Sequence, residues 1–127
     1  MEYALMALRL ISQQPTGALV TAKEIADQVH IPFEVVARVL QALSSRGLLR
    51  AEYGAGGGYQ LSRPLCEVSI YDLNEMLEGH LTLAKCLALN EPCEISGTCN
   101  IVTPIINLNN KVKDFYKSVS LQEVLYV

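Results

Sequence analysis

Three of the four cysteines lie close together and form the pattern Cys-x6-Cys-x5-Cys, at Cys86, Cys93 and Cys99. Thiolates are soft ligands that suit iron–sulfur clusters, zinc and copper(I). Zinc sites usually pair their cysteines at the short spacings Cys-x2-Cys or Cys-x4-Cys, which this stretch lacks. The pattern therefore predicts a metal-binding loop. On the spacing alone, an iron–sulfur cluster and zinc both remain open.

Three thiolates leave one coordination position to be filled from elsewhere. His80, Glu91 and Glu94 are nearby candidates, and Glu2 is a distant one. The fourth cysteine, Cys66, stands alone in the sequence, and we expect it to be a small core residue rather than a ligand.

The elements that position this loop must come from a chain of 127 residues, half of them hydrophobic and 18% charged, which is the balance of a globular protein. The net charge is −3, but it is unevenly spread. Residues 1–65 hold six basic and five acidic residues, whereas residues 66–127 hold four lysines and eight acidic residues. Any contact with nucleic acid is therefore expected in the first half.

No stretch of the sequence approaches the roughly 18 apolar residues of a membrane span. The apolar start, Tyr3 to Ile11, lacks a basic leader and a cleavage site. We expect a cytoplasmic protein, in which clustered cysteines are metal ligands or redox sensors rather than disulfides. There is no phosphate loop, no nucleophile–histidine–acid set and no substrate-binding motif, so an enzyme or electron carrier ranks last among the function classes.

The first half predicts the element order of a winged helix-turn-helix. Thr21-Ala-Lys-Glu24 is a capping box that begins the second helix, and Gly47 is a typical residue to follow the third. The predicted elements are a helix over 2–13, a helix after Thr21, a turn at 30–32, a helix over about 33–46, and strands over 48–53 and 59–61.

The second half predicts a long amphipathic helix after the cysteine loop. Ser69 to Asp72 begins a shorter helix that Gly79 follows, and Thr103-Pro104 is a good start for the long one. Ser120 to Glu123 opens a short final helix. An apolar seam runs along the long helix at Ile105, Leu108, Val112, Phe115 and Val119. We therefore divide the chain into a DNA-binding domain at 1–65 and, at 66–127, a cluster-binding loop with a helix that forms a homodimer through 104–119. The fold class is mainly α with a small β-hairpin.

The helix over 33–46 has two distinct faces. Val36, Val39, Leu40 and Leu43 form the apolar face, and Glu34, Arg38, Gln41 and Ser45 lie opposite. Arginine pairs with guanine edges and glutamine with adenine edges in the major groove, so Arg38 and Gln41 are the expected base contacts. Thr21, Lys23 and Arg46 are better placed for phosphates. The alternative is an ordinary surface ion pair between Glu34 and Arg38.

The glycine-rich stretch 54–58 is the expected tip of the wing. Gly56, Gly57 and Gly58 allow the backbone to approach another backbone or a DNA groove closely, and Tyr59 follows them. We predict DNA contacts at these four residues. Some winged modules contact only proteins, so the wing alone does not prove DNA binding.

The combined pattern resembles the bacterial iron–sulfur winged-helix regulators of the IscR, NsrR and RirA type. The resemblance is carried by Glu2 to Leu5, the wing at Gly54 to Tyr59, the three-cysteine loop and the ending Ser120 to Leu125. It implies a homodimer on near-palindromic promoter sites of double-stranded DNA. It also implies that a [2Fe-2S] or [4Fe-4S] cluster controls binding in response to iron supply, cluster demand, oxidants or nitric oxide.

The sequence departs from that pattern in ways that bear on the cluster. The IscR branch has a histidine where this chain has Val102, and an arginine commonly stands where Tyr53 precedes the wing. The first cysteine interval is one residue longer than usual, and the first helix begins abruptly. The NsrR branch resembles this chain at Glu2, where it carries an acidic residue that reaches the cluster of the partner subunit. The alternative function is a thiol- or zinc-dependent winged-helix regulator without an iron–sulfur cluster.

Overall fold

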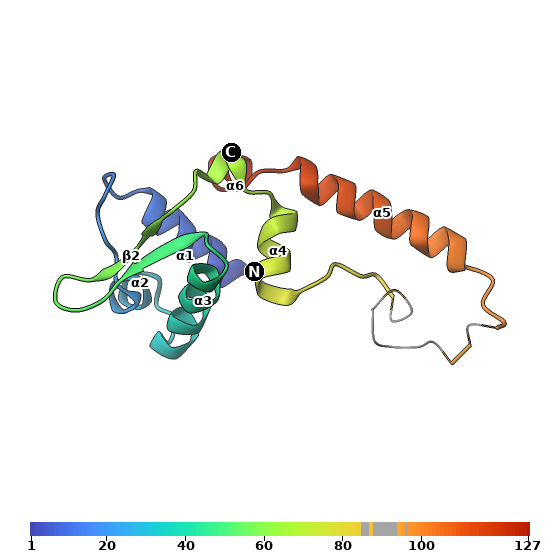
Figure 1. Cartoon of the computed structure of the whole chain (residues 1–127), viewed down its shortest axis with the longest axis horizontal. Helices are drawn as coiled ribbons and strands as arrows, with labels where there is room; N and C mark the ends of the chain where they lie inside the picture. Colours follow the sequence, from blue (N-terminus) through green and yellow to red (C-terminus); the bar gives the residue numbers. More distant parts are fainter. Residues whose placement is uncertain (85–86, 88–93, 96) are drawn as a thin grey trace.

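The computed structural model describes residues 1–84, 87, 94, 95 and 97–127. Figure 1 shows a compact winged portion from which one long helix extends. The order of elements is α1 (Glu2–Ser12), α2 (Ala22–Val29), α3 (Phe33–Ser45), β1 (Leu49–Glu52), β2 (Gly58–Leu61), a 3-10 turn η1 (Leu65–Glu67), α4 (Ile70–Glu78), α5 (Val102–Ser118) and α6 (Leu121–Leu125). The mainly helical fold class with one β-hairpin is confirmed.

The core lies among α1, α2 and α3 and extends beneath the hairpin. Leu8, Ile25 and Leu40 are completely buried there, one from each helix. Burial of side chains of this size contributes about 1.5–3 kcal/mol each to folding. The predicted apolar face of the helix over 33–46 is confirmed at Val36, Leu40 and Leu43, although Val39 is only half-buried.

Capping boxes fix the starts of three helices. The Thr21 hydroxyl accepts a hydrogen bond from the Glu24 backbone N–H (3.1 Å), and the Glu24 carboxylate accepts one from the Thr21 N–H (3.2 Å). Ser69 begins α4 and Ser120 begins α6 in the same way. Each box satisfies amides that would otherwise lack a partner in the first turn. All three predicted starts are confirmed.

The hairpin is antiparallel, and Leu49 pairs with Leu61 at its base. Both strands have different bounds from those predicted, because the pairing stops at Glu52 and Gly58 and leaves Tyr53 outside the ladder. Val20 adds a further bridge, in which its N–H donates to the Tyr59 carbonyl (3.0 Å) and its carbonyl accepts from the Tyr59 N–H (2.8 Å). The wing is therefore fixed to the segment that leads into α2.

The segment at Val68 and the final helix α6 both join the core of the winged portion. Leu121 N–H donates to the Val68 carbonyl (2.8 Å), and Leu121 and Leu125 of α6 are buried in the same core as α1 to α3. The core thus draws side chains from both sides of the boundary predicted at residue 65, and that boundary stays a prediction.

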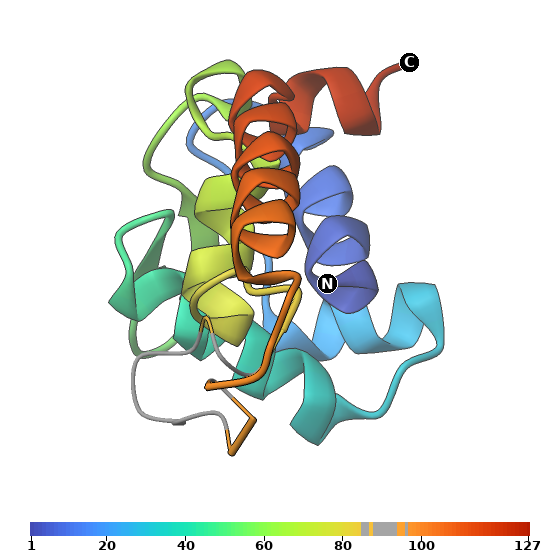
Figure 2. The same cartoon turned by 90° about the vertical axis from the view of Figure 1, so that its right-hand side faces the viewer.

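Helix α5 packs beside α4 and extends away from the winged portion, as Figures 1 and 2 show. It begins at Val102, two residues before the predicted first helical residue Pro104, which lies in the first turn where its missing N–H does no harm. Its predicted apolar seam is partly uncovered, since Leu108 is 50% exposed and Phe115 is 65% exposed, whereas Ile105, Val112 and Val119 are half-buried. None of the helices in the described residues is long and apolar enough to span a membrane.

Candidate DNA-binding surface and cysteine loop

Helix α3 carries a polar face that none of the described residues covers. Glu34, Arg38 and Gln41 are exposed on it, and Arg46 is the exposed C-cap residue. Among the described residues, Glu34 and Arg38 form no ion pair with each other. The guanidinium and the amide are therefore available to an outside partner.

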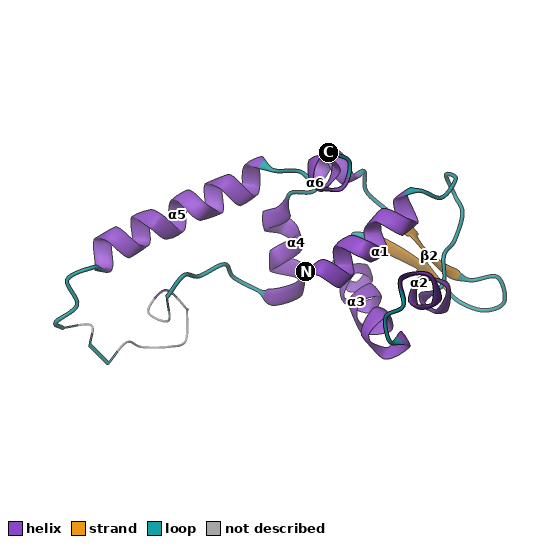
Figure 3. Cartoon of the chain, turned by 180° about the vertical axis from the view of Figure 1, so that it is seen from behind, coloured by secondary structure: helices purple, strands orange, loops and turns teal. Residues whose placement is uncertain are grey.

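A groove of about 530 Å3 lies between the start of α2 and the wing. Thr21 and Lys23 line it on the helix side. Gly56, Gly57, Gly58 and Tyr59 line it on the wing side. The groove brings together six of the predicted DNA-contact residues, whereas Glu34, Arg38, Gln41 and Arg46 lie on the separate exposed face of α3. Figure 3 shows the wing extending beyond α2.

Two of the wing glycines are required by close backbone approaches within the chain. A Cβ atom on Gly58 would lie 2.9 Å from the Val20 carbonyl oxygen, and one on Gly57 would lie 2.3 Å from the Glu52 carbonyl oxygen. Gly56 instead needs its positive φ of 78°. These glycines shape the groove, and direct contacts between them and DNA stay a prediction.

Two aromatic residues at this surface were absent from the predicted contacts. Tyr53 at the wing tip is 93% exposed, and Phe33 at the start of α3 is an exposed lining residue of the groove. Burial and the neighbouring Tyr53 phenol raise the pKa of Tyr59, so its hydroxyl is neutral at physiological pH and can donate a hydrogen bond. In the sequence, the position of Tyr53 directly before the glycine-rich wing at Gly54 was the signal that could have placed it at this surface.

The structure describes only some of the predicted metal ligands. Cys86 and Cys93, and the alternative ligand Glu91, lie outside the described residues. Cys99 is described: it is reduced and half-buried, and it lies two residues before the N-cap of α5. Glu94 is exposed. No three His, Cys, Asp or Glu side chains gather as a metal site within the described residues, which leaves the three-cysteine prediction untested.

The other two candidate ligands lie near the point where the chain leaves α4. His80 Nδ1 is 3.3 Å from the Glu75 carboxylate. Glu2 is exposed, and the terminal ammonium beside it is 3.8 Å from the Glu78 carboxylate at the end of α4. A hydrogen bond from its own backbone N–H, followed by the ammonium charge, lowers the pKa of Glu2. Glu2 is therefore an ionised, exposed carboxylate at neutral pH.

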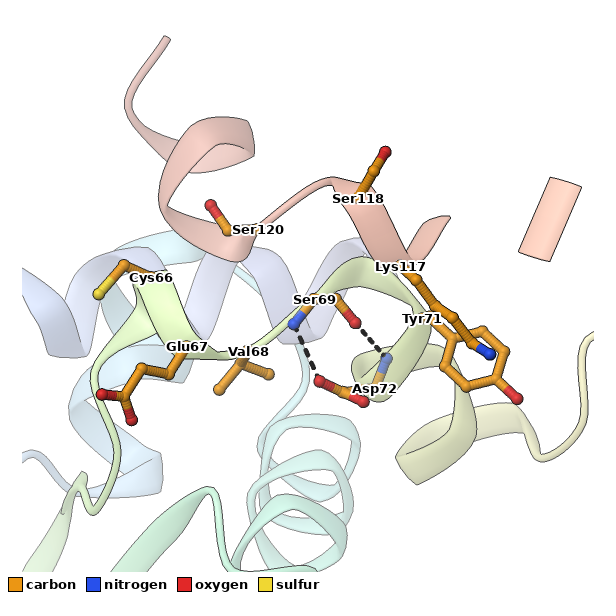
Figure 4. Close-up of a pocket in the computed structure, with 9 residues that line it drawn as sticks. All are labelled: Cys66, Glu67, Val68, Ser69, Tyr71, Asp72, Lys117, Ser118 and Ser120. Carbon is orange, nitrogen blue, oxygen red and sulfur yellow. Dashed lines mark hydrogen bonds between the residues drawn. The ribbon is translucent and has the colours of Figure 1, made fainter. Parts of the chain in front are cut away.

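The prediction that Cys66 is a core residue was wrong, because this thiol is exposed, whereas the prediction that it is not a ligand stays untested. In the 3-10 turn η1, Leu65 takes the buried position and the next side chain faces outward. Cys66 lines a polar hollow of about 450 Å3 between η1 and the end of α5. Figure 4 shows it at the opposite side of the hollow from Lys117, whose ammonium lies 4.7 Å from the Tyr71 ring centre.

A family model described as an iron-dependent transcriptional regulator, Rrf2, matches residues 1–126. The chain belongs to the Rrf2 family. It is therefore a winged-helix transcriptional regulator and not an enzyme, and the predicted resemblance to regulators of the IscR and NsrR type is confirmed.

Similar proteins include Rrf2 members with different names. The HTH-type transcriptional regulator NsrR of Shouchella clausii is 27% identical over 103 residues, which cover 76% of this chain and 69% of the relative. The structure of CymR, the global cysteine regulator of B. subtilis, is 21% identical with a TM-score of 0.72 and covers 98% and 91% of the two chains. T. potens IscR is 20% identical with a TM-score of 0.68, covering 98% and 81%. The two structural similarities support the fold.

Proposed function

We propose that this Rrf2 regulator binds an iron–sulfur cluster through Cys86, Cys93 and Cys99, and that the cluster controls its binding to promoter DNA. The observation that carries the proposal is the set of three thiols in fourteen residues, within a chain that matches a family described as iron-dependent. Cysteine thiolates are the usual ligands of [2Fe-2S] and [4Fe-4S] clusters. When bound by Cys86, Cys93 and Cys99, the cluster would supply a redox- and ligand-sensitive centre in the loop that precedes α5.

The DNA-binding surface is assigned to α3 and to the groove beside the wing. Arg38 and Gln41 read base edges in the major groove. Lys23, Arg46 and the Thr21 hydroxyl contact phosphates, Glu34 limits which bases are accepted beside Arg38, and Gly56 to Tyr59 form the wing contact. The uncovered polar face of α3 and the groove support this division. A regulator of this kind acts where the DNA is, in the bacterial cytoplasm.

The active unit is a homodimer that packs its α5 helices together. The exposed seam of α5 supports this assembly, because a long apolar face left in water is unfavourable by about 25 cal/mol per Å2. Two recognition helices then meet two half-sites of a near-palindromic promoter, about one helical turn of DNA or a multiple of it apart.

Glu2 of the partner subunit is proposed as the fourth ligand. Its exposed, ionised carboxylate can coordinate iron, and Val102 cannot. The competing arrangement uses His80, Glu91, Glu94 or a small molecule. The test is Glu2→Ala, reconstituted without oxygen and compared with wild type by resonance Raman spectroscopy and by DNA binding at fixed salt. A changed iron–ligand spectrum supports Glu2, and an unchanged spectrum with unchanged holo and apo affinities refutes it.

A second candidate is a thiol- or zinc-dependent regulator with the same fold and no iron–sulfur cluster. The exposed Cys66 thiol favours it, because a thiol sensor must be accessible to oxidants. Under this alternative, Cys66→Ala removes the response of DNA binding to oxidant. Under the cluster proposal, it leaves that response intact.

The deciding experiment is anaerobic purification followed by visible absorption and by iron and sulfide assays. DNA binding of the cluster-loaded and cluster-free protein is then compared at one salt concentration, since phosphate contacts make affinity strongly salt-dependent. The proposal expects visible absorption, equal amounts of iron and sulfide, and different DNA affinities for the two forms. Zinc in place of iron, or equal affinities, contradicts it.

A further inference from the structure

Two asparagines hold the segment that leads from α4 into the cysteine loop. We call this segment, residues 79–83, the stem. At its start, the Asn74 side-chain N–H donates to the Gly79 carbonyl (3.1 Å). At its end, the Leu83 backbone N–H donates to the Asn109 side-chain oxygen (2.9 Å). Among the described residues, these two asparagines are the only buried polar side chains.

The burial of Asn109 is unfavourable unless its side-chain amide has a hydrogen-bond partner. It is 4% exposed and is the buried residue of α5, a helix whose apolar seam is only partly covered. Asparagine is a weaker helix former than alanine or leucine. A buried amide is also unfavourable unless it is hydrogen-bonded. The hydrogen bond from the Leu83 N–H, which lies 26 residues away in the sequence, offsets both the weak helix propensity of asparagine and the cost of burying its amide.

Asn74 serves the other end of the stem in the same way. It is buried on α4, which packs against both α3 and α5. Its bond to Gly79 closes the end of α4, where Gly79 adopts a φ of 82° that suits glycine. The stem is therefore fixed to α4 at one end and to α5 at the other.

The stem has a defined place relative to the predicted ligands. Cys86 follows Leu83 by three residues in the sequence, and Cys99 precedes Val102, the first residue of α5, by three. The loop that carries the thiols is thus tied to α5 twice, through the Asn109 hydrogen bond at its entry and through the chain itself at its exit. Fixing both ends reduces the conformational entropy that the loop loses when its thiols bind a common ligand.

We propose that Asn74 and Asn109 are positioning residues that hold the entry of the cysteine loop in a geometry prepared for its ligand. The nature of that ligand rests on the proposed function, whereas the anchoring of the loop does not. Because α4 also packs on α3, the same two bonds fix the stem relative to the DNA-binding helix.

The test compares Asn109→Ala with Asn110→Ala, the same substitution one residue along at an exposed position. Alanine strengthens a helix, so a weakened α5 cannot account for a loss. In the cluster-free protein, amide hydrogen exchange at Leu83 should become at least about fivefold faster in Asn109→Ala, given the typical strength of one buried hydrogen bond. Asn110→Ala should leave it unchanged, and Asn109→Asp, which keeps an acceptor oxygen, should restore slow exchange.

A second readout follows the ligand. Anaerobically reconstituted Asn109→Ala and Asn74→Ala should each lose iron to a chelator at least about fivefold faster than wild type, while far-ultraviolet circular dichroism stays unchanged. Unchanged exchange at Leu83 overturns the anchor, and faster exchange with unchanged iron loss overturns its role in ligand binding. If the wild-type protein takes up no iron and no sulfide, the cluster proposal fails, and exchange at Leu83 still decides whether Asn109 fixes the loop.

Discussion

The winged portion and helix α5 use their hydrophobic side chains in opposite ways. In the winged portion, large apolar side chains such as Leu8, Ile25 and Leu40 are completely buried. On α5, comparable side chains at Leu108 and Phe115 are half or more exposed, and the buried side chain of the helix is Asn109. One region completes its core within a single chain, whereas the other leaves its apolar face open.

This difference separates what the chain needs for folding from what it needs for function. The winged portion completes its core with Leu121 and Leu125 of α6 and leaves the polar face of α3 exposed. Helix α5 leaves part of its apolar seam exposed, and the loop before it carries the three thiols for which we propose a cluster. Substitutions in the two regions should therefore have different kinds of effect.

The largest effect is expected on α5. Replacement of both Leu108 and Val112 by Asp puts two charges into the apolar seam, which in a dimer would cost several kcal/mol, at about 25 cal/mol per Å2 for the lost contact and more for the buried charges. Sedimentation at micromolar concentration should show a dimer for wild type and a monomer or aggregate for the double variant.

The matched control replaces Asn107 and Ser118 by Asp, on the exposed polar side of the same helix. This variant should sediment as wild type does. A wild-type protein that is monomeric and stable at micromolar concentration would refute the proposed dimer.

A smaller effect, of a different kind, is expected in the winged core. Leu40→Ala should lower the free energy of unfolding by about 2–5 kcal/mol, because it removes contacts in a packed core and leaves a cavity. Chemical denaturation monitored by circular dichroism measures this. Leu108→Ala should cost less than about 1 kcal/mol under conditions that keep the chain monomeric. Equal losses of unfolding free energy in Leu40→Ala and Leu108→Ala would contradict the difference between the two regions.

The smallest effects are expected at the surface that meets DNA. Arg38→Ala should weaken binding to the preferred promoter site by about 1–3 kcal/mol and relax base preference at one position. Lys23→Ala should weaken binding to all sequences alike and reduce the slope of log affinity against log salt by about 1. Titrations of specific and scrambled duplexes at several salt concentrations separate the two. If Arg38→Ala weakens both duplexes equally, its role in reading bases is wrong.

Most of the fold follows from local signals in the sequence. The capping boxes at Thr21, Ser69 and Ser120 place three helix starts, because each box satisfies the first-turn amides with residues three positions apart. The glycines after α3 and α4 mark their ends by the same local logic. Periodicity then shows the buried face of α3 at Val36, Leu40 and Leu43.

The features that the sequence did not predict depend on contacts between distant residues. Cys66 is exposed because Leu65 takes the buried place in a turn packed under α6. Val20 bridges Tyr59 across the chain, which explains why Gly58 cannot carry a side chain. Asn109 is buried through a bond to Leu83, and no periodic pattern marks an asparagine as an inward residue.

We propose that the loop thiols, and not Cys66, hold an iron–sulfur cluster. The most direct measurement is iron and sulfide per chain after anaerobic reconstitution of four single variants, in which Cys66, Cys86, Cys93 or Cys99 is replaced by Ala. Cys66→Ala should retain wild-type iron and sulfide, because its exposed thiol lies in η1, outside the loop. Each of the other three should lose most of both. Loss of iron in Cys66→Ala together with full retention in any loop variant would contradict the assignment.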